Sequence, residues 1–261
     1  MKRLITALVL LPIVVAVILA GGEWGVTALL AITGLLAYHE FDLLAAGNGI
    51  ARAGCPGLAA GLALLLAPDP GTIVVLIALL GMALALRVRD LKDSMASAGA
   101  FTLGVVCIFG AWRCARELHA ISPHWLMFAL LLSWAGDTAA LYIGKAFGRR
   151  RLAPRVSPAK TWEGATASLV GGVLVGGIYA HFLLPAAPPS LVLLLAAAGN
   201  IAGQIGDLSK SAWKRGAGVK DSGTMLPGHG GWLDRIDASL FAVPVVYALL
   251  KLYRSLTVAA L

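Results

Sequence analysis

Residues 191–206 read LVLLLAAAGNIAGQIG, an apolar run that ends directly before Asp207. A helix crosses a bilayer with about 20 mostly apolar residues, and this run with its two preceding residues approaches that length. The remainder of the chain is similar, because 59% of its 261 residues are hydrophobic and only 13% are charged. Soluble domains are near half apolar and about a quarter charged. These proportions indicate a polytopic integral membrane protein.

The predicted fold class is all-α, with about nine transmembrane helices. They are expected at residues 4–20, 24–41, 51–67, 71–88, 98–114, 123–145, 164–184, 189–206 and 236–256. We expect residues 4–20 to be a retained span, since an apolar run of ~17 residues is long for the core of a signal peptide. No linker or repeat divides the chain, so one membrane domain, 1–261, is predicted. Residues 1–120 supply N-terminal helices, and residues 121–261 form the catalytic region.

Lys and Arg are concentrated at one end of these predicted spans. With the N-terminus inside the cell, all but four of the 21 Lys and Arg residues fall at inner ends or in inner loops. The exceptions are Arg113, Arg116, Lys251 and Arg254. Because cytoplasmic loops carry an excess of positive charge, we predict that the polar segments 144–164 and 207–237 lie on the cytoplasmic side of the inner membrane.

These two segments are also rich in acids and glycines. Topology alone explains basic residues such as Arg149, Arg150 and Arg151. It does not explain why six of the 13 Asp and Glu residues lie in or beside the segments. The six are Asp137, Glu163, Asp207, Asp221, Asp234 and Asp237. A carboxylate near lipid is costly unless it is paired or binds a metal, so these acids are candidates for a functional site.

Asp207 is expected at the inner end of a spanning helix. Ser211 follows four residues later and so lies on the same helical face. Asn200 and Gln204 lie on a similar face one and two turns earlier. This polar face is predicted to point at a cavity and not at lipid.

Asp234 and Asp237 are three residues apart at the expected start of the last span. Acids at a helix N-terminus are favoured by the helix dipole, so capping is one explanation for Asp234. The other is a Mg²⁺ site that Asp207 and Asp234 supply from both sides of the loop, because Mg²⁺ takes hard oxygen ligands.

Between these acids lie cations and glycines that suit phosphate. Lys214, Arg215 and Lys220 match its charge, and residues 227–231 read PGHGG. Glycines there allow close approach and expose N–H groups to an anion. His229 is a candidate phosphate donor or acid–base group. The set fits chemistry on a nucleoside triphosphate, although the chain has no GxxxxGK[ST] loop.

Residues 211–237, SAWKRGAGVKDSGTMLPGHGGWLDRID, resemble the signature of the phosphatidate cytidylyltransferase (CDP-diglyceride synthase) family at every fixed position. Residues 137–164 resemble that family's second conserved block, whereas the first ~120 residues match only as generic spans. The resemblance implies transfer of a cytidylyl group from CTP to phosphatidate, giving CDP-diacylglycerol and pyrophosphate. It further implies Mg²⁺ on Asp207 and Asp234, with Ser211 near the metal, and a homodimer.

The expected site follows from both lines of reasoning. The catalytic residues are Asp207, Asp234, Ser211, Lys214, Arg215, Lys220 and His229. The substrate-binding residues are Ser157, Lys160, Thr161, Glu163, Asp221, Gly230, Gly231, Arg235, Asp237 and Asp137. Asp221 and Asp237 add acids for a second cation. The partners are CTP and phosphatidate in the bilayer, and no nucleic acid is expected.

Two other functions compete with this prediction. A cytidylyltransferase acting on another lipid phosphate, such as an isoprenoid glycerol phosphate, would share the loop chemistry and differ in its lipid-facing helices. A transporter would place acids near the bilayer midplane and contain inverted repeats. The acids here cluster toward one predicted surface, which favours the enzyme.

Overall fold

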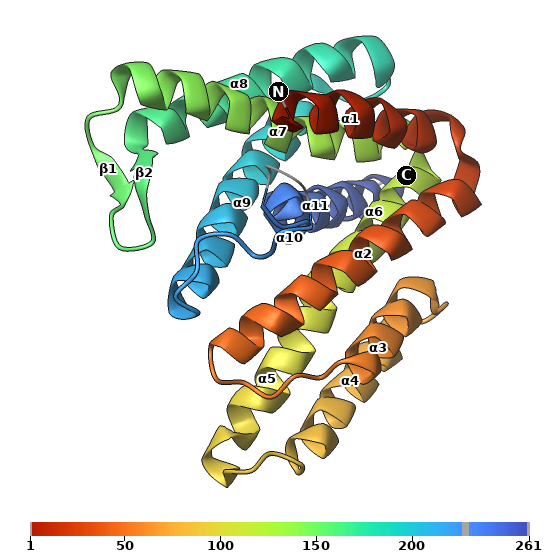
Figure 1. Cartoon of the computed structure of the whole chain (residues 1–261). Coiled ribbons are helices and arrows are strands. Elements are labelled where there is room, and N and C mark those ends of the chain that lie inside the picture. The colour runs from red at the N-terminus through yellow and green to blue at the C-terminus, as the bar shows by residue number, and fades with distance from the viewer. Residues whose placement is uncertain (1, 226–229, 260–261) are drawn as a thin grey trace. The chain divides into compact units, whose positions relative to one another are not determined.

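The structure is a computed structural model that describes residues 2–225 and 230–259. Its described part is helical apart from one short β-hairpin (Figure 1). The chain forms two compact units, each built from separate stretches of sequence. The first unit contains Met1–Val17, Trp24–Arg113 and Trp213–Ile236, and the second contains Ile18–Glu23, Cys114–Ala212 and Asp237–Leu261.

Each of the nine segments predicted to be helical contains a helix. The main helices are α1 (Lys2–Ala20), α2 (Gly22–Gly47), α3 (Cys55–Leu66), α4 (Pro70–Ala85), α5 (Ser94–Val105), α6 (Ala111–Ile121), α7 (Pro123–Phe147), α8 (Trp162–Leu183), α9 (Pro189–Gly216), α10 (Leu233–Ile236) and α11 (Ser239–Ala259). A 3₁₀ turn, η1 (Leu91–Asp93), precedes α5, and a π-helical turn, η2 (Val106–Gly110), joins α5 to α6.

Six helical segments in the described part of the chain are long and apolar enough to cross a membrane. They are Gly22–Gly47, Leu91–Ile121, Pro123–Phe147, Trp162–Leu183, Pro189–Gly216 and Leu233–Thr257. The helices α3 and α4 have 12 and 16 residues and fall short of that length. The protein is therefore an all-α, multi-pass membrane protein, but the predicted number of nine spans is not confirmed.

In the first unit, aromatic side chains pack α2 against α3 and η2. Tyr38 of α2 and Phe109 of η2 are almost fully buried, and their ring centroids are 6.0 Å apart. Phe109 also presses on Gly61 of α3, where an added Cβ would lie 2.1 Å from the ring. Figure 1 shows α3 alongside α4, which packs in turn on α5. This packing holds the second half of α2, which carries Glu40 and Asp42.

In the second unit, small residues bring α7 and α8 together along their length (Figure 1). A Cβ added at Gly136 of α7 would lie 2.6 Å from the Ser168 hydroxyl of α8. One added at Gly172 of α8 would lie 3.1 Å from the backbone carbonyl of Leu132 on α7. Glycines therefore set the close approach of these two helices, as is common in membrane proteins.

Asn200 and Gln204 of α9 lie within this packing, which corrects the prediction that their face points at a cavity. Asn200 is 2% exposed and donates to the Leu132 carbonyl at 3.1 Å and the Ser168 hydroxyl at 3.3 Å. Gln204 donates to the Ala165 carbonyl at 3.1 Å and to Asn200 at 2.8 Å. These amides join three helices by hydrogen bonds, which explains a polar face on an apolar helix without a cavity.

Two differences from the expected layout concern the polar segments. α9 continues ten residues beyond its expected end, so Asp207, Ser211 and Lys214 lie on a helix and not in a loop. The sequence there contains good helix formers, and its basic last turn complements the helix dipole. Within 144–164, strands β1 (Arg151–Ala153) and β2 (Ser157–Thr161) form an antiparallel hairpin that the sequence did not predict.

Candidate active site

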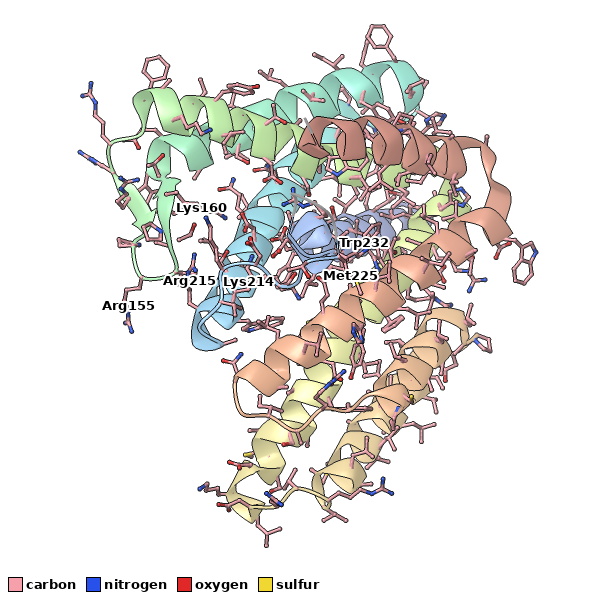
Figure 2. The ribbon with its side chains drawn as sticks, viewed as in Figure 1. Arg155, Lys160, Lys214, Arg215, Met225 and Trp232 are labelled. Carbon is pink, nitrogen blue, oxygen red and sulfur yellow. The ribbon has the colours of Figure 1, made fainter. Side chains whose placement is uncertain are left out.

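The described part of the signature segment (residues 211–237) contains a partly buried ion pair in the first unit. Lys214, in the last turn of α9, donates from Nζ to Asp234 Oδ1 at 2.6 Å. The two side chains are 12% and 8% exposed. Figure 2 shows Lys214 and Arg215 on the end of α9. The structure thus brings together a cation and an acid that the sequence separates by 20 residues.

The second oxygen of Asp234 organises the α9–α10 loop (residues 217–232). Asp234 Oδ2 accepts from the backbone N–H of Ser222 at 2.9 Å and of Gly231 at 3.1 Å. The Gly231 contact is the helix-capping interaction that was one explanation for this acid. Asp234 therefore caps α10, joins the two ends of the loop and pairs with Lys214.

Two glycines of the signature are required by the backbone. Gly230 has a φ of +81°, in the region that favours glycine. A Cβ on Gly231 would lie 2.1 Å from the Ser222 hydroxyl and 2.4 Å from a Glu40 carboxylate oxygen. The positive φ at position 230 and the lack of space at position 231 explain why both residues are glycine, whatever ligand the loop binds.

Glu40 of α2 is the residue that the sequence analysis missed. It is 1% exposed and accepts three hydrogen bonds from the α9–α10 loop and the start of α10. Oε2 accepts from the Ser222 hydroxyl and the Leu233 N–H, both at 2.8 Å, and Oε1 accepts from the Trp232 N–H at 2.9 Å. The signal was present, because Glu40 and Asp42 are carboxylates in a segment otherwise typical of a span.

The other charged residues of the signature in the first unit are exposed. They are Arg215, Lys220, Asp221 and Arg235. Arg215 donates to the Val219 carbonyl at 3.3 Å. Lys220 and Asp221 directly precede Ser222, so they lie at the edge of the loop that Asp234 holds. His229 lies outside the described residues, and its expected role stays a prediction.

In the second unit, Asp207 forms its own ion pair with a lysine. Lys160 of β2 pairs with Asp207 Oδ2, and both side chains are 28% exposed. Ser211, one turn later on α9, donates weakly to Asp207 Oδ1 at 3.4 Å. Figure 2 shows Arg155 at the tip of the hairpin, whereas Lys160 lies nearer its base. The hairpin thus brings Lys160, from the conserved block at residues 137–164, to Asp207 of α9.

Two other residues of the conserved block at residues 137–164 have structural partners. Thr161 is buried and caps α8 by accepting from the Gly164 N–H at 3.1 Å. Glu163 accepts from the N–H groups of Arg149 at 3.1 Å and Arg150 at 3.3 Å. Ser157 is half-buried at the start of β2. Thr161 and Glu163 therefore hold the hairpin on α8, in addition to any contact with substrate.

The remaining two acids differ in burial. Asp237 follows α10, is 8% exposed and accepts from the Ala238 N–H at 2.7 Å. Asp137 is exposed on α7. Asp137, Asp207 and Asp237 belong to the second unit, whereas Asp221 and Asp234 belong to the first.

The carboxylates fit the chemistry of a bound Mg²⁺. In residues 2–225 and 230–259 no three His, Cys, Asp or Glu side chains gather closely enough to hold a metal by themselves. Mg²⁺ commonly uses only one or two carboxylates and takes its other ligands from water and substrate phosphates. Asp207 suits this, because the bond that its Oδ1 accepts from Ser211 is long, at 3.4 Å. Asp234 would have to exchange Lys214 for the metal.

Comparison with known proteins gives one consistent result. The model of the cytidylyltransferase family matches residues 1–253. The chain is 36% identical over 260 residues to the phosphatidate cytidylyltransferase of Pseudomonas aeruginosa, covering 95% of this chain and 96% of that protein. It is 33% identical to the enzyme of the same name from Staphylococcus saprophyticus, covering 95% and 98%. A 39% identical match to the Haemophilus influenzae phosphatidate cytidylyltransferase spans about half of each protein, 56% and 53%. Because both the family model and two relatives cover nearly all of the chain, it belongs to the cytidylyltransferase family.

Proposed function

We propose that the protein transfers the cytidylyl group of CTP to phosphatidate and releases pyrophosphate. The observation that supports this most is the similarity along nearly the whole chain to proteins named phosphatidate cytidylyltransferase. The two lysine–carboxylate pairs agree with it, since they combine groups for phosphate and for a divalent cation. The product is CDP-diacylglycerol, so the protein serves phospholipid synthesis.

The reaction needs no covalent enzyme intermediate. An oxygen of the phosphatidate phosphate attacks the α-phosphorus of CTP, and the bond from that phosphorus to the β-phosphate oxygen breaks. Pyrophosphate leaves with the bonding electrons. The lipid phosphate is already a nucleophile, so the protein must mainly orient the two substrates and offset their negative charge.

The lysines and the glycine-rich loop supply this charge compensation. Lys214, Lys160 and the exposed Arg215, Lys220 and Arg235 are cations in or beside the two conserved blocks. We assign them to the phosphates of CTP, lipid and pyrophosphate. We assign Gly230 and Gly231 to the same site, where glycine lets the backbone approach a phosphate closely. Mg²⁺ on Asp207 and Asp234, when bound, neutralises phosphate charge, and Asp221 and Asp237 are available to a second cation.

The proposal includes a location. CTP is a cytosolic anion, while phosphatidate keeps its head group at the membrane surface and its chains in lipid. A polar cavity on the cytoplasmic side of the inner membrane would admit both, and the net charge of +8 suits anionic substrates and an anionic surface. We also carry forward a homodimer, which the mass of the purified protein in mild detergent tests.

The deciding experiment uses purified protein in detergent micelles with phosphatidate, α-labelled CTP and Mg²⁺. Label should enter the chloroform phase only when Mg²⁺ is present, and Asp234→Asn should abolish it. If folded protein fails with phosphatidate but labels an isoprenoid glycerol phosphate, the lipid substrate is wrong and the chemistry stands. If every lipid phosphate fails, the enzyme proposal is wrong and transport becomes the function to test.

A further inference from the structure

Glu40 is a buried carboxylate whose three assigned donors all come from the α9–α10 loop and the start of α10. Ser222, Trp232 and Leu233 donate to it at 2.8 to 2.9 Å. These donors lie 182 to 193 residues away in the sequence. A buried carboxylate is stable only when it is paired or hydrogen-bonded, so its environment depends on this loop being in place.

The backbone of the loop is pressed against this carboxylate. A Cβ added at Gly223 would lie 2.5 Å from Glu40 Oε1, and one added at Gly231 would lie 2.4 Å from Oε2. The contact therefore depends on glycine at both positions as well as on the acid. Such a fit fixes the direction of the backbone on either side of the loop.

Glu40 and Asp234 bind the same two parts of the loop from different elements. Ser222 gives its N–H to Asp234 and its hydroxyl to Glu40. On the other side, Gly231 donates to Asp234, while Trp232 donates to Glu40. The two acids thus close the base of residues 222–232. If Asp234 exchanged its Lys214 partner for a metal, Glu40 would still hold the loop to α2.

We infer that Glu40 is a positioning residue for CTP: by holding Ser222, Trp232 and Leu233 it fixes the two described sides of the α9–α10 loop. Those two sides carry Lys220 and Asp234, which we assign to the nucleotide phosphates and their cation. This inference rests on the proposed function for the identity of the ligand. It assigns a role in the reaction to α2, which lies in the N-terminal half of the chain. That half resembles the family only in having generic membrane spans. Glu40 acts through the loop and does not itself touch substrate.

Asp42 provides a matched control on the same helix. It is 4% exposed and also accepts three hydrogen bonds, from Arg52 Nε at 3.1 Å, Ala53 N at 2.8 Å and Gly54 N at 3.2 Å. Those donors belong to the connection between α2 and α3, away from the signature segment. Asp42→Asn therefore measures the effect of neutralising a buried acid of α2 without disturbing the loop.

The test compares Glu40→Gln, Asp42→Asn and Ser222→Ala with the wild-type protein in micelles. Amide hydrogen exchange at Trp232 and Leu233 should rise about tenfold or more in Glu40→Gln, because the amide side chain cannot accept from all three donors. Exchange there should stay at the wild-type rate in Asp42→Asn. Ser222→Ala removes one donor and should give a smaller rise, and it keeps the test valid if Glu40→Gln does not fold.

The second arm measures cytidylyl transfer at varied CTP. Glu40→Gln should lower kcat/KM for CTP by about tenfold to a hundredfold, the usual effect of losing hydrogen bonds to a charged group. Asp42→Asn should stay within about threefold of wild type, because it leaves those bonds in place. Unchanged exchange at Trp232 and Leu233 would overturn the inference, and so would faster exchange with unchanged kcat/KM. If the wild-type protein were inactive on CTP, both the proposed function and the role of Glu40 in CTP binding would be wrong. The hydrogen-exchange pattern would still decide whether Glu40 holds the loop.

Discussion

At the scale of single residues, the two lysine–carboxylate pairs differ in how deeply they are buried. The Lys214–Asp234 side chains are 12% and 8% exposed, whereas those of Lys160 and Asp207 are both 28% exposed. Asp234 also holds two backbone N–H groups. Asp234 therefore has a structural role in addition to its proposed chemical one, whereas the role proposed for Asp207 is mainly chemical.

Asp234→Asn and Asp207→Asn should both reduce turnover at least about a hundredfold, as expected when a charged group essential to phosphate transfer is neutralised. Their effects on stability should differ. Asp234→Asn leaves Lys214 buried without its anion and should lower Tm by about 5 °C or more, while Asp207→Asn should lower it by about 2 °C at most. Thermal unfolding in detergent checks this. Equal shifts in Tm would show that the burial of a lysine–carboxylate pair does not determine how much the pair contributes to stability.

The sequence located most acids and cations of the site but not Glu40. Asp207, Asp234 and Lys214 belong to a recognisable chemical pattern within a short segment. Glu40 gains its meaning only from donors more than 180 residues away, which no local pattern reveals. From the sequence we predicted a substrate-binding role for Thr161 and Glu163 but not their structural roles. Thr161 caps α8 and Glu163 anchors the hairpin, and both roles depend on the residue at which α8 begins.

At the scale of secondary-structure elements, the β1–β2 hairpin is held on α8 in part by the side chain of Glu163. Glu163 accepts from the backbone N–H groups of Arg149 and Arg150. Glu163→Ala should therefore raise amide exchange at both residues by about fivefold or more, because backbone donors lose their acceptor. It should also lower activity through Lys160. Hydrogen exchange with mass spectrometry measures the first effect.

Arg150→Gln is the control for this prediction. The side chain of Arg150 is exposed, and its backbone N–H donates to Glu163. The substitution keeps that N–H, so exchange and turnover should both stay near wild type. A large loss of turnover would identify Arg150 as a substrate ligand and not as a charge that orients the protein.

The α7–α8 contact predicts opposite outcomes for two glycines of one helix. A Cβ at Gly172 would lie 2.7 Å from the Asn200 amide nitrogen, whereas one at Gly177 would meet no atom within 4 Å. Gly172→Ala should destabilise the protein by about 1–3 kcal/mol through overpacking. Gly177→Ala should be neutral or stabilise it by up to about 1 kcal/mol, because alanine favours helix. Thermal unfolding of both variants measures this. A lower Tm for Gly177→Ala than for Gly172→Ala would contradict this packing.

The helices themselves were largely predictable, because hydropathy over a 20-residue window is a strong signal. The hairpin was not, since residues 157–161 read SPAKT, which has little β-propensity. Its strands pair because Glu163 and the Trp162 N–H hold the segment beside α8. The end of α9 was also predicted wrongly. The fall in hydropathy at Asp207 marks the end of the apolar run, but the helix continues beyond it.

At the scale of the whole molecule, membrane topology follows from the distribution of Lys and Arg. In a variant whose three cysteines, Cys55, Cys107 and Cys114, are replaced by serine, Arg155→Cys and Ala186→Cys introduce single reporters at exposed positions. In right-side-out vesicles an impermeant maleimide should label position 186 directly. Position 155 should react only after permeabilisation, since the hairpin is predicted to be cytoplasmic. Labelling of both or the reverse pattern would contradict the predicted orientation.

Composition established the class of the whole molecule, but it did not reveal how distant segments combine. The first unit joins residues 24–113 to residues 213–236. Its polar contacts link Glu40 of α2 to the α9–α10 loop, and hydropathy contains no information on such pairings. The number of spans was also beyond a hydropathy count, because α3 and α4 are apolar but short.

The distance in sequence between Glu40 and its donors has a consequence for biosynthesis. Ser222 is translated 182 residues after Glu40, an interval on the order of 10–40 s at ribosomal rates of about 5–20 residues per second. During that time α2 enters the membrane with an acid whose partners do not yet exist, and an acid within a span opposes insertion. A chain that stops before Ser222 lacks all three donors. An unfinished protein therefore differs from a finished one in its second helix, where Glu40 has none of these three hydrogen-bond donors.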